Sequence, residues 1–389
     1  MKRVYQIISY ILVAVLASMV TFFACNDMQM AAQQSAGISK LDQLSALIEE
    51  RFIGEANRTD YEDAAAAAMV DALGDEWSYY IPASQYQAHM ETMNNAYVGI
   101  GITILVREEG DGFEVTKVNA GGPADEAGMI AGDVIVGIEG HDAAGMTADE
   151  AKSLVRGEEN TQVKLTLKRG QEIIELTVTR KQVLTPVATG QMLDGNIGLV
   201  TIANFDDRCF DESKAAIDAL IEAGAVALIF DVRNNPGGYK HELVYLLDEL
   251  LPAGPLFRAE DYLGRVEVDE SDPQYLDIPM AVLVNGYSYS AAEFFAAALS
   301  EYEAAIVVGQ QTYGKGYFQT TIVLNDGSAV GLSVGKYTTP NGKNLAGVGI
   351  TPDIVVEVDD DTDFKIYAGT MDPALDPQIQ AAVEALKTK

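Results

Sequence analysis

The sequence is poor in cysteine and in basic residues, and each shortage argues against a class of protein. Only Cys25 and Cys209 occur among 389 residues, so a disulfide framework is not expected and stability must come from packing. The 58 acidic residues outnumber the 26 basic ones and give a formal net charge of −32, and Lys and Arg form no cluster. Because phosphate binding requires clustered cations, nucleic acid is not an expected partner.

Histidine is also scarce, and no residue pattern typical of a metal site is present. The three histidines are His89, His141 and His241, and none stands in the context of a triad base, although His241 closely follows a Gly-Gly turn. There is no HExxH-like motif and no Cys/His cluster, so we expect neither a metal nor another cofactor. We interpret Cys209 as an ordinary thiol, because a nucleophilic cysteine needs a base or a helix N-terminus beside it.

The N-terminal region contains the longest apolar run. Lys2 and Arg3 precede a nearly uncharged stretch from Val4 to Ala24, which is long enough to span a bilayer. The two basic residues favour a cytoplasmic N-terminus, so the rest of the chain would be exported. We expect residues 1–26 to be a signal-anchor; a cleaved signal peptide, or a lipoprotein signal with Cys25 as the lipidated residue, is an alternative.

One serine lies where a buried strand gives way to a helix. Ala281 to Val284 is a short apolar strand, Asn285 to Tyr289 a polar turn, and Ala291 to Leu299 a run of good helix formers. Ser290 therefore stands at a helix N-terminus, where free N–H groups and the helix dipole stabilise an oxyanion. This position suits a nucleophile, but serine is also a common N-cap, so the position alone does not decide its role.

A lysine 25 residues downstream of Ser290 adds a second element of a catalytic pattern. Lys315 stands between Gly314 and Gly316, and Gln319 follows four residues later. With the SYSAAE turn around Ser290, this Gly-Lys-Gly pattern resembles the C-terminal processing peptidases, also called tail-specific proteases. The resemblance implies Ser290 as nucleophile, Lys315 as general base and Gln319 as the residue that orients the amine.

The proposed base can act only when its amine is neutral. Lowering the pKa of Lys315 from ~10.4 to near 7 requires burial in an apolar pocket without a carboxylate partner. The turn departs from the family pattern at Tyr289 and Ala292, neither of which is the nucleophile position. We interpret Glu293 as a first-turn helix charge or an internal hydrogen-bond acceptor rather than a catalytic acid.

Short strands with glycine turns occupy the region from Tyr97 to about Lys181. The stretches YVGIGI and GGPADEAGMIAGDVIVGIEG, at 97–102 and 121–140, resemble a PDZ domain. The expected elements are strands at 102–106, 113–118, 134–138, 163–167 and 173–178 and a helix at 147–155. A PDZ domain binds a chain terminus through the N–H groups of a glycine-rich turn and by strand addition, although such glycines can also serve only a tight turn.

The resemblance to PDZ domains also implies which residues bind a peptide. The carboxylate-binding turn would be Val98, Gly99, Ile100 and Gly101. The wall of the groove would be Ile102 and the apolar side of the helix, namely Ala151, Leu154 and Val155.

From Val183 onward the sequence alternates between strand and helix signals, which predicts an α/β fold. Strands are expected at 197–202 and 226–231, helices at 212–223 and 241–251, and hairpins at 256–268 and 320–334. The DVRNNPGG segment at 231–238 forms a second strand-turn-helix unit. By resemblance to the peptidase family, the oxyanion hole would be the N–H of Gly237 or Gly238 together with that of Ala291, and the core would be crotonase-like.

The chain is therefore expected to contain four regions. They are the signal segment 1–26, a helical region 37–94 that could support a homodimer, a PDZ domain 95–181 inserted before the core, and an α/β peptidase domain 182–389. The leading hypothesis is a membrane-anchored serine endopeptidase that cleaves exported proteins near their C-terminal tails. The alternatives are a non-enzymatic PDZ receptor or adaptor and, from the crotonase-like fold, an acyl-thioester enzyme.

Overall fold

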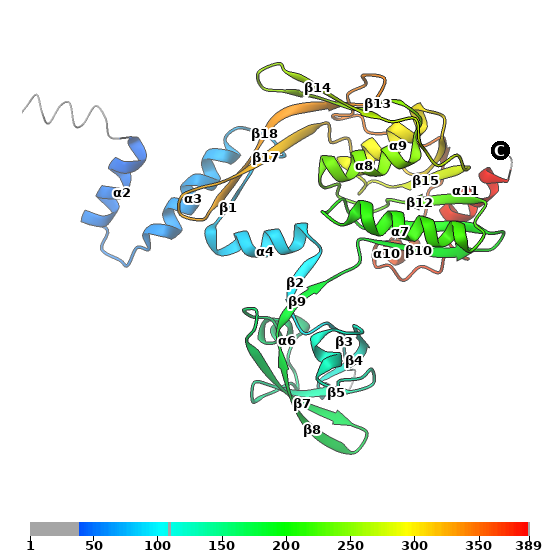
Figure 1. Cartoon of the computed structure of the whole chain (residues 1–389). Coiled ribbons are helices and arrows are strands. Elements are labelled where there is room, and N and C mark those ends of the chain that lie inside the picture. Colours follow the sequence, from blue (N-terminus) through cyan, green and yellow to red (C-terminus); the bar gives the residue numbers. More distant parts are fainter. Residues whose placement is uncertain (1–38, 108–109, 388–389) are drawn as a thin grey trace, which may run out of the picture. The chain divides into compact units, whose positions relative to one another are not determined.

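The computed structural model describes residues 39–107 and 110–387, and the chain divides into two units, Met1–Leu73 and Gly74–Lys389. The described part of the first unit consists of α2 (Lys40–Arg51) and α3 (Arg58–Asp71) (Figure 1). Each helix begins at a side-chain cap: Ser39 accepts the N–H of Asp42, and Asn57 accepts that of Thr59. The predicted signal-anchor lies outside the described residues. Within 39–107 and 110–387, no helix combines the length and the apolar character needed to cross a membrane.

A six-stranded, mainly parallel sheet forms the centre of the second unit. Its strand order is β10-β11-β12-β15-β16-β19, and only β10 runs antiparallel to its neighbour. The strands are β10 (Ala188–Leu193), β11 (Ile197–Ile202), β12 (Ala227–Asp231), β15 (Met280–Val284), β16 (Ala305–Gly309) and β19 (Ile354–Val355). This arrangement confirms the predicted α/β character of the C-terminal region.

Helices cover both faces of this sheet, which is why β15 is apolar at every position and β12 at every position except its last, Asp231. Leu228 and Phe230 point to the core beneath α7 (Cys209–Glu222), α8 (Lys240–Leu250) and α9 (Ala291–Glu301). Ala227 and Ile229 point to the opposite core, which α11 (Pro377–Leu386) covers. Successive side chains of a strand face opposite sides, so a strand between two helical layers needs no polar face.

A second, antiparallel sheet has the order β1-β18-β13-β14, with β17 paired to β18. Its strands are β1 (Tyr79–Ile81), β13 (Gly254–Asp261), β14 (Val266–Ser271), β17 (Tyr317–Val323) and β18 (Ala329–Thr338). The two hairpins predicted from the sequence are confirmed as β13–β14 and β17–β18. Strand β1 and helix α10 (Asp360–Tyr367) were not predicted, whereas α4 (Ala83–Met93) lies in the expected helical region 37–94, although no bounds were predicted for it.

The region between residues 102 and 179 forms a separate β-rich module. The strand order is β3-β4-β5-β7-β8, with β6 paired to β5. The elements are β3 (Ile102–Val106), β4 (Phe113–Val118), α5 (Pro123–Glu126), β5 (Val134–Ile138), β6 (His141–Asp142), α6 (Ala148–Val155), β7 (Gln162–Arg169) and β8 (Glu172–Thr179). All five predicted strands and the predicted helix are confirmed to within two residues.

Two antiparallel strands form the stem through which the chain enters and leaves this module. Strand β2 (Ala96–Gly99) pairs with β9 (Lys181–Leu184), in register from Ala96–Leu184 to Gly99–Lys181. The module is therefore tied to the rest of the second unit by two chain connections that are hydrogen-bonded to each other.

Candidate active site

Ser290 occupies a strained turn at the carboxyl end of a parallel strand. It lies between β15 and α9 and has φ 58° and ψ −126°, a conformation that residues other than glycine rarely adopt. The residue is 9% exposed, and its N–H donates to Glu293 Oε2 at 3.0 Å. Backbone strain of this kind concentrates at functional sites, where the surrounding structure holds it in place. The turn therefore fits the nucleophile position predicted from the sequence.

A glycine turn from the neighbouring strand lies directly against Ser290. A Cβ atom on Gly237 would lie 2.7 Å from Ser290 Cβ and 2.8 Å from the nitrogen of Ala291, and its φ is +88°. Gly237 therefore has to be glycine for two independent reasons. Its N–H donates to Asn235 Oδ1 at 2.8 Å, whereas the N–H of Gly238 and that of Ala291 have no acceptor within the described residues.

Reciprocal side-chain contacts lock the two turns together. Asn285 Oδ1 accepts the N–H of Asn234 at 2.9 Å, and Asn285 Nδ2 donates to Asn234 Oδ1 at 2.9 Å. The N–H of Tyr289 donates to the carbonyl of Asn235 at 3.1 Å. Because β12 and β15 are adjacent and parallel, their following turns meet at one edge of the sheet, and these bonds fix their spacing.

A buried ion-pair network supports the glycine turn from behind. Arg233 pairs with Asp231 at 2.6 Å and with Asp376 at 2.8 Å, and its guanidinium also donates to Gln378 Oε1 at 2.9 Å. The network connects the end of β12 to the start of α11. A buried charge network with every partner satisfied rigidifies the segment that carries it.

Lys315 lies in a partly buried site beside aromatic rings. Its Nζ lies 4.4 Å from the centre of the Trp77 ring and 5.9 Å from that of Tyr289. Burial lowers the pKa of Lys315 to about 8, while the negative charges of Asp75 and Glu293 act in the opposite direction. The neutral amine that a general base requires is therefore accessible near neutral pH. Within the described residues, Lys315 Nζ makes no hydrogen bond to Ser290 or Gln319.

Glu293 joins the backbone of Ser290 to that of Lys315. One carboxylate oxygen accepts the N–H of Ser290 at 3.0 Å and the N–H of Lys315 at 2.8 Å. The other accepts the N–H of Gly314 at 2.7 Å and the hydroxyl of Thr312 at 2.6 Å. The side chain is fully buried, and burial raises its pKa although these hydrogen bonds oppose the shift. The sequence interpretation of Glu293 as an internal acceptor is confirmed, but its link to the lysine loop was missed.

Gln319 lies on β17 and is not bonded to the lysine. Its Nε2 donates to Ser333 Oγ at 3.0 Å and to the carbonyl of Tyr317 at 3.3 Å. The structure thus places Gln319 on the strand that follows the lysine loop, with its amide directed to β18. Its orienting role stays a prediction.

The β-rich module has a groove of about 440 Å³ between β3 and α6. Of the predicted peptide-binding residues, Gly99, Ile100, Gly101, Ile102 and Val155 line it. Val98, Leu154 and Ala151 are not among the residues that line it, and the peptide-binding role of the whole set stays a prediction. The residues that the sequence analysis missed are Tyr97, Thr103, Ile104, Ala148, Asp149, Lys152 and Arg156.

Helix and strand periodicity explains these differences. Ala148, Lys152 and Val155 share the face of α6 that borders the groove, with spacings of four and three residues. Leu154 packs against the module core instead. On β2, side chains alternate between faces, so Val98 points away from the groove that Tyr97 and Gly99 line. Applying these two periods to the sequence would have identified Lys152.

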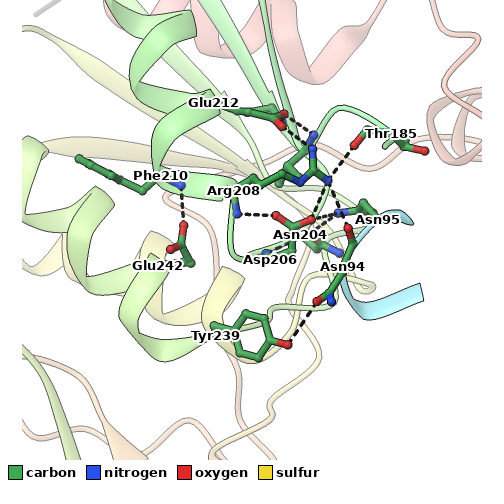
Figure 2. Close-up of polar contacts among 12 residues, drawn as sticks. Asn94, Asn95, Thr185, Asn204, Asp206, Arg208, Phe210, Glu212, Tyr239 and Glu242 are labelled. Atoms are coloured by element: carbon green, nitrogen blue, oxygen red, sulfur yellow. Dashed lines mark hydrogen bonds and ion pairs between the residues drawn. The ribbon is translucent and has the colours of Figure 1, made fainter. Parts of the chain in front are cut away.

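Arg208 connects the stem of the β-rich module to the sheet domain (Figure 2). Its guanidinium donates to the carbonyl of Asn94 at 3.2 Å, two residues before β2, and to that of Thr185 at 3.0 Å, directly after β9. The same group pairs with the buried Asp206 at 2.9 Å, and Asn95 Nδ2 donates to Asp206 at 3.1 Å. Both chain connections are therefore held to the loop that precedes α7.

That loop also contacts the glycine turn of the active site. The N–H of Phe205 donates to the carbonyl of Gly237 at 2.8 Å, and the carbonyl of Phe205 accepts the N–H of Tyr239 at 2.7 Å. A Cβ on Gly238 would collide with the Phe205 carbonyl at 2.2 Å, which explains the second glycine. The base of the stem and the turn beside Ser290 thus share one short segment.

Neither of the two other candidate groups in the described region fits a catalytic role. The ring of His241 stacks on Tyr239 with 5.5 Å between ring centres, and its Nε2 lies 3.4 Å from the carboxylates of Asp207 and Glu242. Cys209 is completely buried, and burial raises the pKa of its thiol far above the usual range. The thiol stays protonated and is not a nucleophile.

Comparisons with known proteins agree with this geometry. The profile of peptidase family S41 matches residues 196–356, and that of the PDZ domain matches residues 114–169. The carboxy-terminal processing protease CtpA of Bacillus subtilis (strain 168) is 34% identical over 371 residues, which cover 92% of this chain and 79% of that protein. A probable CtpA-like serine protease of Staphylococcus aureus (strain MRSA252) is 31% identical, over 83% of this chain and 65% of that protein.

A solved structure shows the same fold. The crystal structure of a putative S41 protease from Bacteroides fragilis NCTC 9343 has a TM-score of 0.50 and 18% sequence identity, and the match covers 75% of this chain and 83% of that chain. The S41 match includes the glycine turn, Ser290 and Lys315, and the PDZ match covers residues 114–169 of the β-rich module. The chain belongs to peptidase family S41 and is a serine-type carboxy-terminal processing peptidase that carries a PDZ domain.

Proposed function

We propose that Ser290 is the nucleophile and Lys315 the general base of an endopeptidase that cleaves exported proteins near their C-terminal tails. The observation that carries the proposal is the shared Glu293 oxygen, which holds the backbone of both residues within one hydrogen-bond length of the same atom. Because the two N–H groups lie this close together, a rotation of the Lys315 side chain can bring its amine to the Ser290 hydroxyl. The lowered pKa of Lys315 supports its role as a base near neutral pH.

The reaction would proceed through an acyl-enzyme. Lys315 takes the proton of the Ser290 hydroxyl as Ser290 Oγ forms a bond to the peptide carbonyl carbon. The tetrahedral intermediate collapses as the C–N bond breaks, and Lys315 delivers the proton to the leaving amine. A water molecule then attacks the ester, gives a proton to Lys315, and the product carboxylate leaves as Ser290 regains its proton. Gln319 would hold the amine in line once Lys315 turns toward Ser290.

The oxyanion hole is proposed to consist of the N–H groups of Gly238 and Ala291. Both groups lack an acceptor in the described part of the chain, and Ala291 is the first residue of α9. The alternative donor, Gly237, is less suitable because its N–H already donates to Asn235. An oxyanion donor has to be available when the charge develops, so the unpaired groups are the better candidates.

The PDZ groove is proposed to capture the substrate tail. The N–H groups of the turn 98–101 would bind the terminal carboxylate, and the tail would add a strand to β3. Two contacts support a coupling between tail capture and the glycine turn. Arg208 contacts the stem (Figure 2), and the N–H of Phe205 donates to the carbonyl of Gly237.

We also propose the domain bounds, the core fold, the oligomeric state and the location that the sequence predicts. The domains would be residues 37–94, 95–181 and 182–389, and the parallel sheet with its helices would be a crotonase-like core. The exposed apolar side chains of α2, such as Leu44 and Leu47, would support a homodimer. Residues 1–26 would place the enzyme on the extracytoplasmic side of the membrane as an anchor or signal.

The proposal is tested by incubating the full chain with an unstructured peptide that ends in an apolar tail and mapping the products by mass spectrometry. Wild type is expected to cleave, whereas Ser290→Ala and Lys315→Ala are each expected to lose at least a thousand-fold in kcat/KM. An adaptor without peptidase activity would bind the tail equally well in all three proteins and release no fragment. Turnover retained by either variant would end the dyad assignment.

A further inference from the structure

The ammonium group of Lys315 faces an aromatic surface. Its Nζ lies over the ring of Trp77 at 4.4 Å from the ring centre and 5.9 Å from the ring centre of Tyr289. Within the described residues it has no hydrogen-bond acceptor. An ammonium within about 6 Å of a ring centre is attracted by the negative potential of the ring face, and the attraction is strongest for Trp.

Three aromatic rings form a connected cluster at this position. The ring centre of Trp77 lies 5.3 Å from that of Tyr313 in an edge-on arrangement and 6.1 Å from that of Tyr289. Tyr289 and Tyr313 are 5.7 Å apart, and the hydroxyl of Tyr313 donates to Glu76. We call Trp77, Tyr289 and Tyr313 the aromatic cage. Packed against one another, the rings hold the indole face in place toward the lysine.

The segment that carries Trp77 is fixed to the sheet beside the active site. Ser78 Oγ donates to Asp75 at 2.5 Å and accepts the N–H of Ser333 at 3.1 Å. Ser333 Oγ in turn accepts Nε2 of Gln319 at 3.0 Å. Residues 75–78 therefore belong to the hydrogen-bond network of Gln319, although they lie outside the segments matched by the S41 and PDZ profiles.

We propose, on the basis of the proposed role of Lys315 as general base, that Trp77 is a positioning residue of the active site. Its indole face holds the protonated amine of Lys315 over the ring, away from Ser290. When the amine loses its proton, it leaves the ring and turns to Ser290. The substrate-free enzyme is thereby kept with its base charged and away from the nucleophile. Loss of the positive charge removes most of the attraction to the ring, so deprotonation and release are coupled.

The charged groups around Lys315 act together with the cage. Asp75 lies on the same segment as Trp77, and Glu293 lies on α9; both favour the protonated amine, while burial disfavours it. Glu76 contacts the cage through the hydroxyl of Tyr313, which donates to its carboxylate. Because the carboxylates remain in place when the ring is altered, a change in the indole alone isolates the contribution of the cage.

Trp77 is the single tryptophan of the sequence, so the indole can be altered without touching any other residue. The full chain is prepared with tryptophan replaced by mono-, di- and tetrafluorotryptophan, which weaken the ring potential stepwise at nearly constant shape. We expect the pH midpoint of kcat to fall progressively, by roughly half to one and a half units across the series. A midpoint that does not move with fluorination overturns the proposal, because a purely structural ring would behave this way.

A second readout needs no substrate. The fluorescence of Trp77 in the full chain is recorded from pH 6 to 10, in wild type and in Lys315→Met, which keeps an apolar side chain of similar length. We expect a titration near pH 8 in wild type that is absent in Lys315→Met. A curve identical in both proteins overturns the cage. If the titration is present but Lys315→Ala still cleaves peptides, the cage stands and the proposed base is wrong, so the two failures are distinguishable.

Discussion

Glu293 illustrates how a single buried carboxylate can set the geometry of a site through hydrogen bonds to the backbone. Each of its oxygens accepts two hydrogen bonds, and the four donors come from Ser290, Thr312, Gly314 and Lys315. A buried carboxylate with four donors is well compensated for its lost hydration. The N–H of Ser290 is used in this way, whereas the next N–H along the chain, that of Ala291, has no acceptor in the described residues and is the proposed oxyanion donor.

Burial of Lys315, the proposed general base, lowers the stability of the folded protein, and the loss depends on pH. Its folded-state pKa of about 8 is below the ~10.4 expected in the unfolded chain. Between these values the unfolded chain binds more protons than the folded protein, so stability rises with pH. The penalty is present in full below about pH 8 and disappears above about pH 10.4.

We therefore expect Lys315→Met to raise the free energy of unfolding at pH 7 by about 2 kcal/mol. This is less than the difference between the folded and unfolded pKa values implies, because Lys315 is only partly buried. The gain should shrink toward zero as the pH approaches 10.5. Urea denaturation at pH 7 and pH 10 measures it, with Lys343→Met, an exposed lysine, as the matched control. An equal gain at both pH values would contradict the assignment of a depressed pKa.

At the scale of elements, the site depends on two strand-turn-helix units whose turns meet at one sheet edge. The unit β12–α8 provides the glycine turn, and β15–α9 provides Ser290. Neither turn would suffice alone, because the proposed oxyanion donors come from one residue of each. The spacing of the turns is set by strand pairing and by the Asn234–Asn285 contacts.

A pair of glycine substitutions tests this spacing. Gly237 and Gly224 both have positive φ, of 88° and 96°, so alanine costs about 1 kcal/mol of strain at either position. Only at Gly237 would the new Cβ press on Ser290 and Ala291; at Gly224 nothing lies within 4 Å. We expect Gly237→Ala to lower kcat/KM for a tail peptide by at least a hundred-fold and Gly224→Ala by less than three-fold. Similar losses in both variants would show that backbone strain, and not the clash at the site, is responsible.

At the scale of the whole molecule, the sequence predicts those parts of the site that are formed by residues close together in the chain. The turn at Ser290, the glycine turn and the hairpins follow from apolar runs and turn residues that are adjacent in the chain. Trp77 could not be found in this way, because it meets Lys315 across more than 200 residues of sequence and through strand β1, which is only three residues long. A strand that short carries no periodic signal.

The groove shows a second limit of sequence reasoning. Leu154 was predicted to line it because it is apolar, but α6 turns this side chain toward the module core and presents Lys152 to the groove. Which face of a short helix borders a groove depends on the sheet against which it packs. The resemblance to PDZ domains predicted that a groove exists, but only the folded structure shows which face of α6 borders it.

The central claim is that a neutral Lys315 activates Ser290, and the pH dependence of acylation tests it most directly. The full chain is mixed with a tail peptide in a quenched-flow instrument, and the acyl adduct on Ser290 is quantified by intact mass spectrometry and peptide mapping between pH 6 and 9.5. The acylation rate should rise about tenfold per pH unit below pH 8 and level off above it, and Lys315→Met should lose this rise together with most of the rate. A rate that is flat across this range in wild type, or an adduct that forms equally fast in Lys315→Met, would contradict the account.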